Sequence, residues 1–260
     1  MKLLIENWRG YVKEDVELNI GSSAHPHQNL NEKLWDENDQ LKPEVKERLL
    51  EIAQQFISKT QGSEANIKDI ILTGSLANYN YSILSDIDLH LLLDFAELNS
   101  DEDLVKDYFD AVKALWNYLH DIRIKGHEVE IYVQNEREPH VSTGIYSLLN
   151  DDWVKKPEVS VIEDSPADNA TIEKKVNSLM DQIDRALSLM NKQKYDEAHA
   201  RANKISEKIK KFRRAGLEGI GEYSVENLAF KKLRNNGYLG KLSDLKRESY
   251  DSMMSLKENK

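Results

Sequence analysis

The 260-residue chain contains no cysteine and carries a formal net charge of −10 at pH 7. The missing cysteines exclude disulfides, thiolate nucleophiles and cysteine-ligated zinc or iron–sulfur sites, and the acidic balance argues against extended DNA binding. Apolar residues make up 40% and charged residues 32% of the chain, which is enough for a core beneath a well-solvated surface. No apolar run reaches the roughly 18 residues of a membrane helix, so we expect a cytoplasmic protein with no membrane partner.

Residues 1–42 are predicted to form an amino-terminal arm. Apolar residues between positions 3 and 16 recur at roughly helical spacing, which indicates a short amphipathic helix that is docked or partly disordered. Residues 17–42 lack sustained periodicity and are expected to form a loop or extended segment. The first residues, with Leu4-Ile5-Glu6, also resemble the capsid-targeting leaders of internal proteins in large tailed phages, which are cut after such a glutamate. That resemblance implies a phage protein whose mature form starts at Asn7.

A helix is predicted from Pro43 to about Thr60. Proline is well accepted in a first helical turn, where its missing N–H costs no hydrogen bond. Six apolar residues then recur at helical spacing and are expected to pack on a sheet: Val45, Leu49, Ile52, Ala53, Phe56 and Ile57. A strand over residues 67–73 is predicted to follow.

The strand at 67–73 leads into Gly74 and Ser75, and residues 76–82 are predicted to form a short helix. Backbone N–H groups at a helix start can bind phosphate oxygens. Glycine allows the backbone to approach closely, and the serine hydroxyl adds a donor. Gly74 and Ser75 are therefore candidate phosphate-binding residues.

A second strand begins at Asp86 and separates apolar from polar side chains with period 2. Its apolar face comprises Ile87, Leu89, Leu91, Leu93 and Phe95. Asp86, Asp88 and His90 share the opposite face, where the two carboxylates stand roughly 6–7 Å apart along the strand. Carboxylates this close repel each other, and a divalent cation is the usual reason to keep both ionised. We assign His90 a supporting role rather than a ligand role.

A long amphipathic helix and a third strand follow. The helix is expected to begin at a capping box over residues 100–103 and to bury Leu104, Tyr108, Ala111, Val112, Leu115, Trp116 and Leu119. In the strand at 127–133, the core residues Val129, Ile131 and Val133 alternate with Glu128, Glu130 and Tyr132. Glu128 and Glu130 are therefore the two acidic residues on the open face of this strand.

Together these three segments resemble the signature of the polymerase-β-like nucleotidyltransferase superfamily. That signature places Gly-Ser after an apolar residue, then a spacer, then Asp-x-Asp, and later an acid between apolar residues. In this chain it reads Leu72-Thr73-Gly74-Ser75, Ser85-Asp86-Ile87-Asp88-Leu89 and Val129-Glu130-Ile131. The resemblance covers residues 70–133, and the third acid is Glu where the family more often has Asp.

The resemblance implies an α+β fold: a small mixed β-sheet, the nucleotidyltransferase palm, with helices on one face, followed by a helical domain. It also implies an enzyme that moves an NMP from an NTP, by default ATP, to a hydroxyl of a small molecule, a protein or an RNA end. Asp86, Asp88 and Glu130 would be its catalytic carboxylates and would bind two Mg²⁺ ions, with Mn²⁺ as a substitute. Gly74 and Ser75 would hold the β- and γ-phosphates.

The expected domains are the arm at 1–42, a catalytic domain at 43–168 and a helical domain at 169–260. Residues 135–168 are loop-rich, and within them Tyr146 and Trp153 are more typical of core or rim residues than of nucleobase contacts. Apolar stripes predict helices at 172–190, 195–214, 224–235 and 243–256.

Basic residues gather in the predicted helical domain: Lys204, Lys208, Lys210, Lys211, Arg213, Arg214, Lys231, Lys232 and Arg234. In an acidic chain this clustering indicates either a solvated helix face or a surface for a triphosphate or an anionic acceptor such as RNA. Lys211 and Arg214 are our candidate nucleotide-binding residues within it.

Other interpretations of the acidic strand faces stay open. An inactive member of the same fold would bind nucleotide or a partner protein, and a phage member would be packaged as an internal capsid protein. A sheet whose open side merely meets water would also carry acidic residues there, although strand interiors disfavour aspartate.

Overall fold

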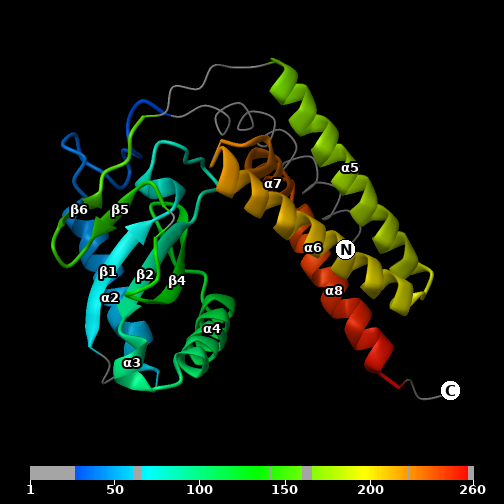
Figure 1. Cartoon of the computed structure of the whole chain (residues 1–260), viewed down its shortest axis with the longest axis horizontal. Coiled ribbons are helices and arrows are strands. Elements are labelled where there is room, and N and C mark those ends of the chain that lie inside the picture. Colours follow the sequence, from blue (N-terminus) through cyan, green and yellow to red (C-terminus); the bar gives the residue numbers. More distant parts are fainter. Residues whose placement is uncertain (1–26, 61–65, 141, 160–165, 222, 257–260) are drawn as a thin grey trace. The chain divides into compact units, whose positions relative to one another are not determined.

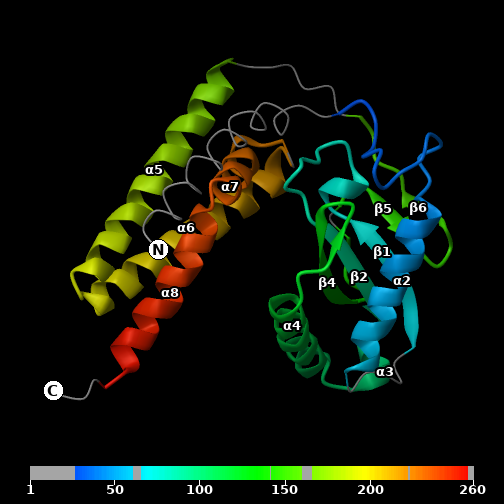
Figure 2. The same cartoon turned by 180° about the vertical axis from the view of Figure 1, so that it is seen from behind.

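The computed structural model describes residues 27–60, 66–140, 142–159, 166–221 and 223–256 (Figures 1 and 2). The predicted leader and amphipathic helix at 1–26 lie outside the described residues. The architecture is mixed α+β, and the chain divides into two compact units. One unit is His25–Ile162, and the other contains Glu163–Lys260.

The first unit, here the sheet unit, is built on a six-stranded mixed sheet in the order β3–β4–β2–β1–β5–β6. The strands are β1 (Ile67–Thr73), β2 (Ile87–Leu93), β3 (Arg123–Ile124), β4 (His127–Asn135), β5 (Ile145–Ser147) and β6 (Asp152–Lys155). Strand β2 pairs antiparallel with β1 and parallel with β4. The strands that carry the predicted acids are therefore direct neighbours.

Three helices share one hydrophobic core with the sheet: α2 (Pro43–Ser58), α3 (Phe95–Leu98) and α4 (Glu102–Leu119). All six apolar residues predicted for α2 are buried, and α2 crosses in front of the strands in Figure 2. The alternate apolar residues of β2 are buried in the same core. We call the other side of the sheet, which carries Asp88 and Glu130, the open face.

The stripe predicted for α4 is confirmed only in part: Trp116 is buried, and Tyr108 and Val112 pack against the core as partly buried residues. Leu104, Leu115 and Leu119 are exposed, whereas the buried residues of α4 are Val105, Phe109 and Trp116. Trp116 packs edge-on against Phe56 of α2, with 5.5 Å between ring centroids, so large aromatic rings determine the buried face. The cap also differs from the predicted box, since the Asp101 carboxylate accepts the Leu104 N–H at 3.1 Å.

Residues 27–42, expected to be a loop, form turns but also supply core side chains. Trp35 is buried, and its indole N–H donates to the Leu76 carbonyl at 2.8 Å. Its ring stacks on Trp153 of β6 at 4.6 Å and meets Tyr146 of β5 edge-on at 5.1 Å. The core role expected for Tyr146 is thus confirmed, with Trp153 half-buried beside it. The aromatic cluster ties the segment before α2 to the β5–β6 hairpin.

We expect Trp35→Ala to lower the free energy of unfolding by about 3–5 kcal/mol, because it leaves a large cavity and an unpaired carbonyl. Urea unfolding followed by circular dichroism measures the change. Tyr118→Ala, at a side chain that is 81% exposed, is the control and should shift stability by less than about 0.5 kcal/mol. Equal effects of the two variants would contradict this account of the core.

The second unit, here the helical unit, comprises α5 (Pro166–Asn191), α6 (Tyr195–Gly219), α7 (Val225–Asn235) and α8 (Tyr238–Met254). Helices α5 and α6 form a hairpin, and α7 and α8 pack on it (Figure 1). The predicted stripe of α5 is buried at Ile172, Val176, Leu179 and Ile183. Helix α8 begins at Tyr238 rather than at residue 243. No helix in the described part of the chain is long and apolar enough to cross a membrane.

Candidate active site

The turn after β1 places Gly74 and Ser75 at the edge of the open face. Gly74 has φ 77° and ψ −162°, a backbone conformation that residues other than glycine rarely adopt. The Ser75 hydroxyl donates to Ser85 Oγ at 2.8 Å, and Ser85 Oγ also accepts the Ser82 N–H at 2.9 Å. Ser85 therefore closes the loop between β1 and β2 next to the first aspartate.

The helix predicted over residues 76–82 was wrong. Only Ser75–Ala77 form a 3-10 turn, and the following residues are extended or irregular. Asn78 explains part of this, because its side-chain oxygen accepts the Tyr79 N–H at 2.7 Å, a local bond that competes with helix formation. The expected set of free N–H groups at a helix start is therefore reduced to the turn itself.

Asp88 and Glu130 lie opposite each other across the β2–β4 pair. Both are half-buried on the open face, between strand positions that are fully buried on the other face. Paired strands run roughly 4.8 Å apart, so the backbones of these two acids are immediate neighbours. Asp86 lies two residues before Asp88 and directly precedes β2. The structure thus brings Asp88 and Glu130 together on the open face, with Asp86 in the loop position directly before β2.

Gly74 packs directly against Asp88. A Cβ added at Gly74 would overlap the Asp88 carboxylate. Thr73, the preceding residue, is the β1 partner of Asp88 and its hydroxyl donates to the Gly144 carbonyl at 3.2 Å. The glycine thus lets the turn come as close to the aspartate as the backbone allows.

Glu128 takes a different environment from Glu130. It lies opposite Arg123 in the β3–β4 pair and forms a 3.6 Å ion pair with that guanidinium. Burial raises the pKa of the Glu128 carboxyl, and the charge of Arg123 acts in the opposite direction. Since Glu130 rather than Glu128 is the register partner of Asp88, the geometry favours Glu130 as the third site carboxylate.

A small polar cluster holds the Glu130 side chain. The Tyr132 hydroxyl donates to Glu130 Oε2 at 2.5 Å, and burial, followed by this hydrogen bond, raises the pKa of Tyr132. His90 stacks on the Tyr132 ring at 4.8 Å, and its Nδ1 donates to Gln134 Oε1 at 3.0 Å. Burial lowers the pKa of His90 to about 4, so this imidazole is neutral at pH 7. His90 therefore supports the neighbouring phenol, which fits its predicted supporting role.

Two contacts of the candidate site were not predicted from the sequence. Tyr132 was placed on the open face, but its hydrogen bond to Glu130 depends on a side-chain geometry that periodicity does not define. His127, at the start of β4, donates from Nδ1 to the Ser85 carbonyl at 2.6 Å. That bond anchors the residue before Asp86, and a lone histidine in the sequence carries no signal of it.

The donor set suits a hard divalent cation, because carboxylate oxygens are the ligands that Mg²⁺ prefers. Within the described ranges, however, no three His, Asp or Glu side chains are grouped closely enough to hold a metal ion. Glu130 is held in place by the hydrogen bond from Tyr132. The backbone thus brings acidic residues of two neighbouring strands together, while the aspartate side chains would still have to converge with Glu130 on a cation.

Comparisons with protein-family models, with curated proteins and with solved structures found no match to this chain. The site therefore has to be interpreted from its own residues. Of the other predicted site residues, Lys211 and Arg214 lie exposed on α6 of the helical unit. Their assignment to nucleotide binding stays a prediction.

Proposed function

We propose that this chain is a metal-dependent nucleotidyltransferase that moves an NMP from an NTP, by default ATP, to an acceptor hydroxyl. One observation carries the proposal: Asp88 faces Glu130 across β2 and β4, and the Gly74 turn packs so closely against Asp88 that a Cβ at Gly74 would overlap its carboxylate. A sheet face that only met water would need neither the paired acids nor a glycine in a strained conformation against one of them.

The carboxylates of Asp86, Asp88 and Glu130 would hold the cations. Bound there, Mg²⁺ would neutralise charge on the transferring phosphoryl group and lower the pKa of the acceptor hydroxyl. The residues of the Gly74–Ser75 turn would meet the phosphates through backbone N–H groups and the serine hydroxyl. Because that hydroxyl donates to Ser85, phosphate binding by Ser75 would exchange one hydrogen bond for another.

Glu130 is better suited to hold a cation than to act as a general base. Its Oε2 atom already accepts the hydroxyl of Tyr132. A general base needs an oxygen that is free to reach the proton of the acceptor hydroxyl. We therefore assign Glu130 to charge stabilisation on the nucleophile side and leave deprotonation of the acceptor to the bound metal.

The test is label transfer. Purified protein is incubated with each α-labelled NTP and Mg²⁺ or Mn²⁺, with and without a cell lysate that supplies acceptors. The proposal predicts a labelled product whose formation needs the metal and is lost in the Asp86→Ala/Asp88→Ala double variant. The labelled product names the acceptor. No label above that of the double variant, with any nucleotide and metal, would reject the catalytic proposal.

Tyr132→Phe tests the role of the phenol. We expect about a tenfold loss of label transfer, because removal of one charge-assisted hydrogen bond lets Glu130 leave its site geometry. The cost in stability should be only about 1 kcal/mol. Tyr118→Phe, on the exposed side of α4, is the matched control and should leave both quantities unchanged. Activity of Tyr132→Phe at the wild-type level would show that the bond to Glu130 has no part in catalysis.

One observation favours a second candidate, an inactive member that binds nucleotide or a partner protein. Among the described residues, no three Asp, Glu or His side chains lie close enough together to hold a metal ion. This candidate predicts ATP binding that does not change when Mg²⁺ is replaced by EDTA and no label transfer. The catalytic candidate predicts the opposite for both measurements. Cytoplasmic location, ATP as donor and a phage origin remain predictions.

A further inference from the structure

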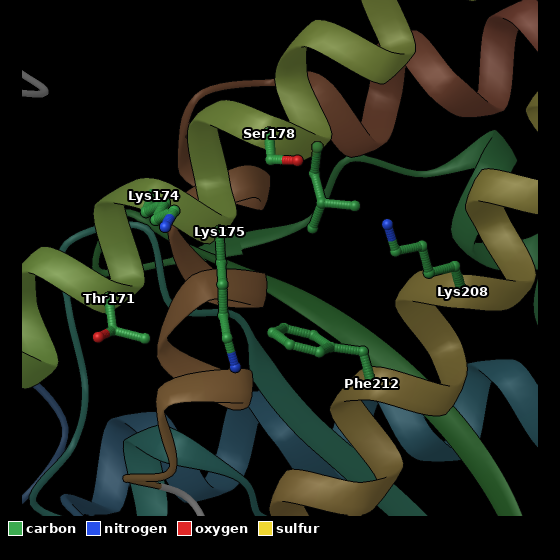
Figure 3. Close-up of a pocket in the computed structure, with 7 residues that line it drawn as sticks. Thr171, Lys174, Lys175, Ser178, Lys208 and Phe212 are labelled. Atoms are coloured by element: carbon green, nitrogen blue, oxygen red, sulfur yellow. The ribbon is translucent and has the colours of Figure 1, made fainter.

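A cavity of about 450 Å³ lies within the helical unit, between α5 and α6. Its lining residues are Thr171, Lys174, Lys175, Ser178, Leu179, Lys208 and Phe212. Figure 3 shows the Lys208 side chain reaching from α6 toward α5, while Lys175 and Phe212 point toward each other across the space between the helices. The volume lies within the range of small-molecule sites, roughly 300–1,000 Å³.

Charge in this cavity is opposite to that of the chain as a whole. Three of the seven lining residues are lysines and none is acidic, although the chain carries a net charge of −10. Lys175 is partly neutralised, because its ammonium lies 2.7 Å from Glu226 and 4.7 Å from the Phe212 ring centroid. Lys208 donates to the neutral amide of Gln182 at 3.2 Å, and Lys174 is exposed with no carboxylate partner in the described part of the chain. After Glu226 is counted, about two positive charges remain for a ligand.

The rest of the wall combines apolar and hydroxyl groups. Leu179 and Phe212 provide apolar surface, to which the lysine stems add. Thr171 and Ser178 supply hydroxyl donors from the same helix. A phosphate monoester carries −1.5 to −2 charges at pH 7 by the usual second pKa of about 6, which balances the two uncompensated lysines.

We propose that the cavity between α5 and α6 binds a small organic phosphate monoester, with its phosphate at Lys174 and Lys208 and its apolar part against Leu179 and Phe212. Inorganic phosphate alone would leave the apolar wall unfilled, and an uncharged ligand would leave the lysines without a counter-charge. The proposal goes beyond the nucleotidyltransferase assignment and does not rest on it, because every lining residue belongs to the helical unit.

AMP is the probe, and binding is measured by isothermal titration calorimetry on the full chain in EDTA, so that no metal site contributes. We expect saturable binding of AMP, with adenosine and inorganic phosphate each bound at least about tenfold more weakly. Lys174→Gln/Lys208→Gln should weaken AMP binding by about tenfold or more, because two charge-assisted contacts are lost. The matched control is Lys192→Gln/Lys241→Gln, which removes the same charge from exposed positions of the helical unit outside the cavity and should bind AMP within about twofold of wild type.

A second titration, with a 5′-phosphorylated oligoribonucleotide, identifies the kind of molecule that carries the phosphate. If a short 5′-phosphorylated oligoribonucleotide binds through the same two lysines more tightly than AMP, the natural ligand is the end of an RNA. If AMP binds at least as well, it is a free nucleotide or a similar metabolite. The proposal is overturned if neither probe binds saturably, or if the control variant loses as much affinity as Lys174→Gln/Lys208→Gln. The Asp86→Ala/Asp88→Ala variant should bind AMP like wild type, so failure of the proposed catalysis is seen separately.

Discussion

Asp88→Asn should lower nucleotidyl transfer by on the order of a thousandfold or more, the largest effect expected of any single substitution in the sheet unit. Asn keeps the size of the side chain and one oxygen, but it removes the charge that would hold a divalent cation beside Glu130. Asp88 is also the residue against which the Gly74 turn packs, so an isosteric replacement is needed to leave that packing intact.

The same substitution should not unfold the protein. Without metal, Asp88 and Glu130 place two carboxylates side by side on paired strands, and removing one of them relieves repulsion between like charges. We therefore expect the Tm of Asp88→Asn in EDTA to equal or exceed that of wild type. Excess Mn²⁺ should raise the wild-type Tm by selective binding to the folded state and leave the variant unchanged.

Asp107→Asn is the matched control, since it removes one carboxylate from an exposed position of α4 in the same unit. It should keep full activity and the full Mn²⁺ response. Retention of activity in Asp88→Asn, or a Mn²⁺ shift equal to that of wild type, would show that Asp88 is not a metal ligand.

Periodicity was sufficient where one face of an element packs on the core. The six buried residues of α2 were all predicted, because helical spacing leaves a single apolar stripe to bury. Period 2 likewise placed Asp88 and Glu130 on the open face of their strands. The face of a strand is a local property, and so it can be derived from a few consecutive residues.

Which residue of the neighbouring strand lies opposite a given residue cannot be derived from a few consecutive residues. A shift of the β2–β4 register by two residues would keep every side chain on its face and yet place Asp88 opposite Glu128 or Tyr132. The choice of Glu130 came from its apolar neighbours and the family resemblance, and the observed register agrees with it. The hydrogen bond from Tyr132 to Glu130 follows from that register and the side-chain rotamers, which the sequence pattern does not encode.

Short elements and distant aromatic contacts were the main omissions. Strands β5 and β6 span three and four residues, which is too few for a periodic signal. Trp35 belongs to a segment without periodicity, and it is buried by Tyr146 and Trp153 from the far end of the unit. On α4, equally spaced leucines and aromatic residues competed for the core, and the larger rings took the buried face.

Gly74→Ala should cost at least about 2–3 kcal/mol of stability and about a hundredfold in activity, two effects with different causes. The stability loss comes from the backbone, since φ 77° with ψ −162° is accessible to glycine and strained for alanine. The activity loss comes from the new Cβ, which would overlap the Asp88 carboxylate and has to displace either the turn or the aspartate. Chemical unfolding measures the first effect, and label transfer at saturating NTP measures the second.

Gly126→Ala separates these two causes. Gly126 lies in the β3–β4 turn of the same unit with φ 96°, but a Cβ there would meet no atom within 4 Å. It should therefore lose about 1–2 kcal/mol of stability through backbone strain and keep its activity. If Gly74→Ala retained activity while losing stability, the close approach of the turn to Asp88 would be a folding device only. If Gly74→Ala loses much more activity than Gly126→Ala when equal fractions of both variants are folded, the close packing of the turn against Asp88 serves catalysis. The turn would hold the phosphates and Asp88 would hold the metal, so the two have to lie in contact.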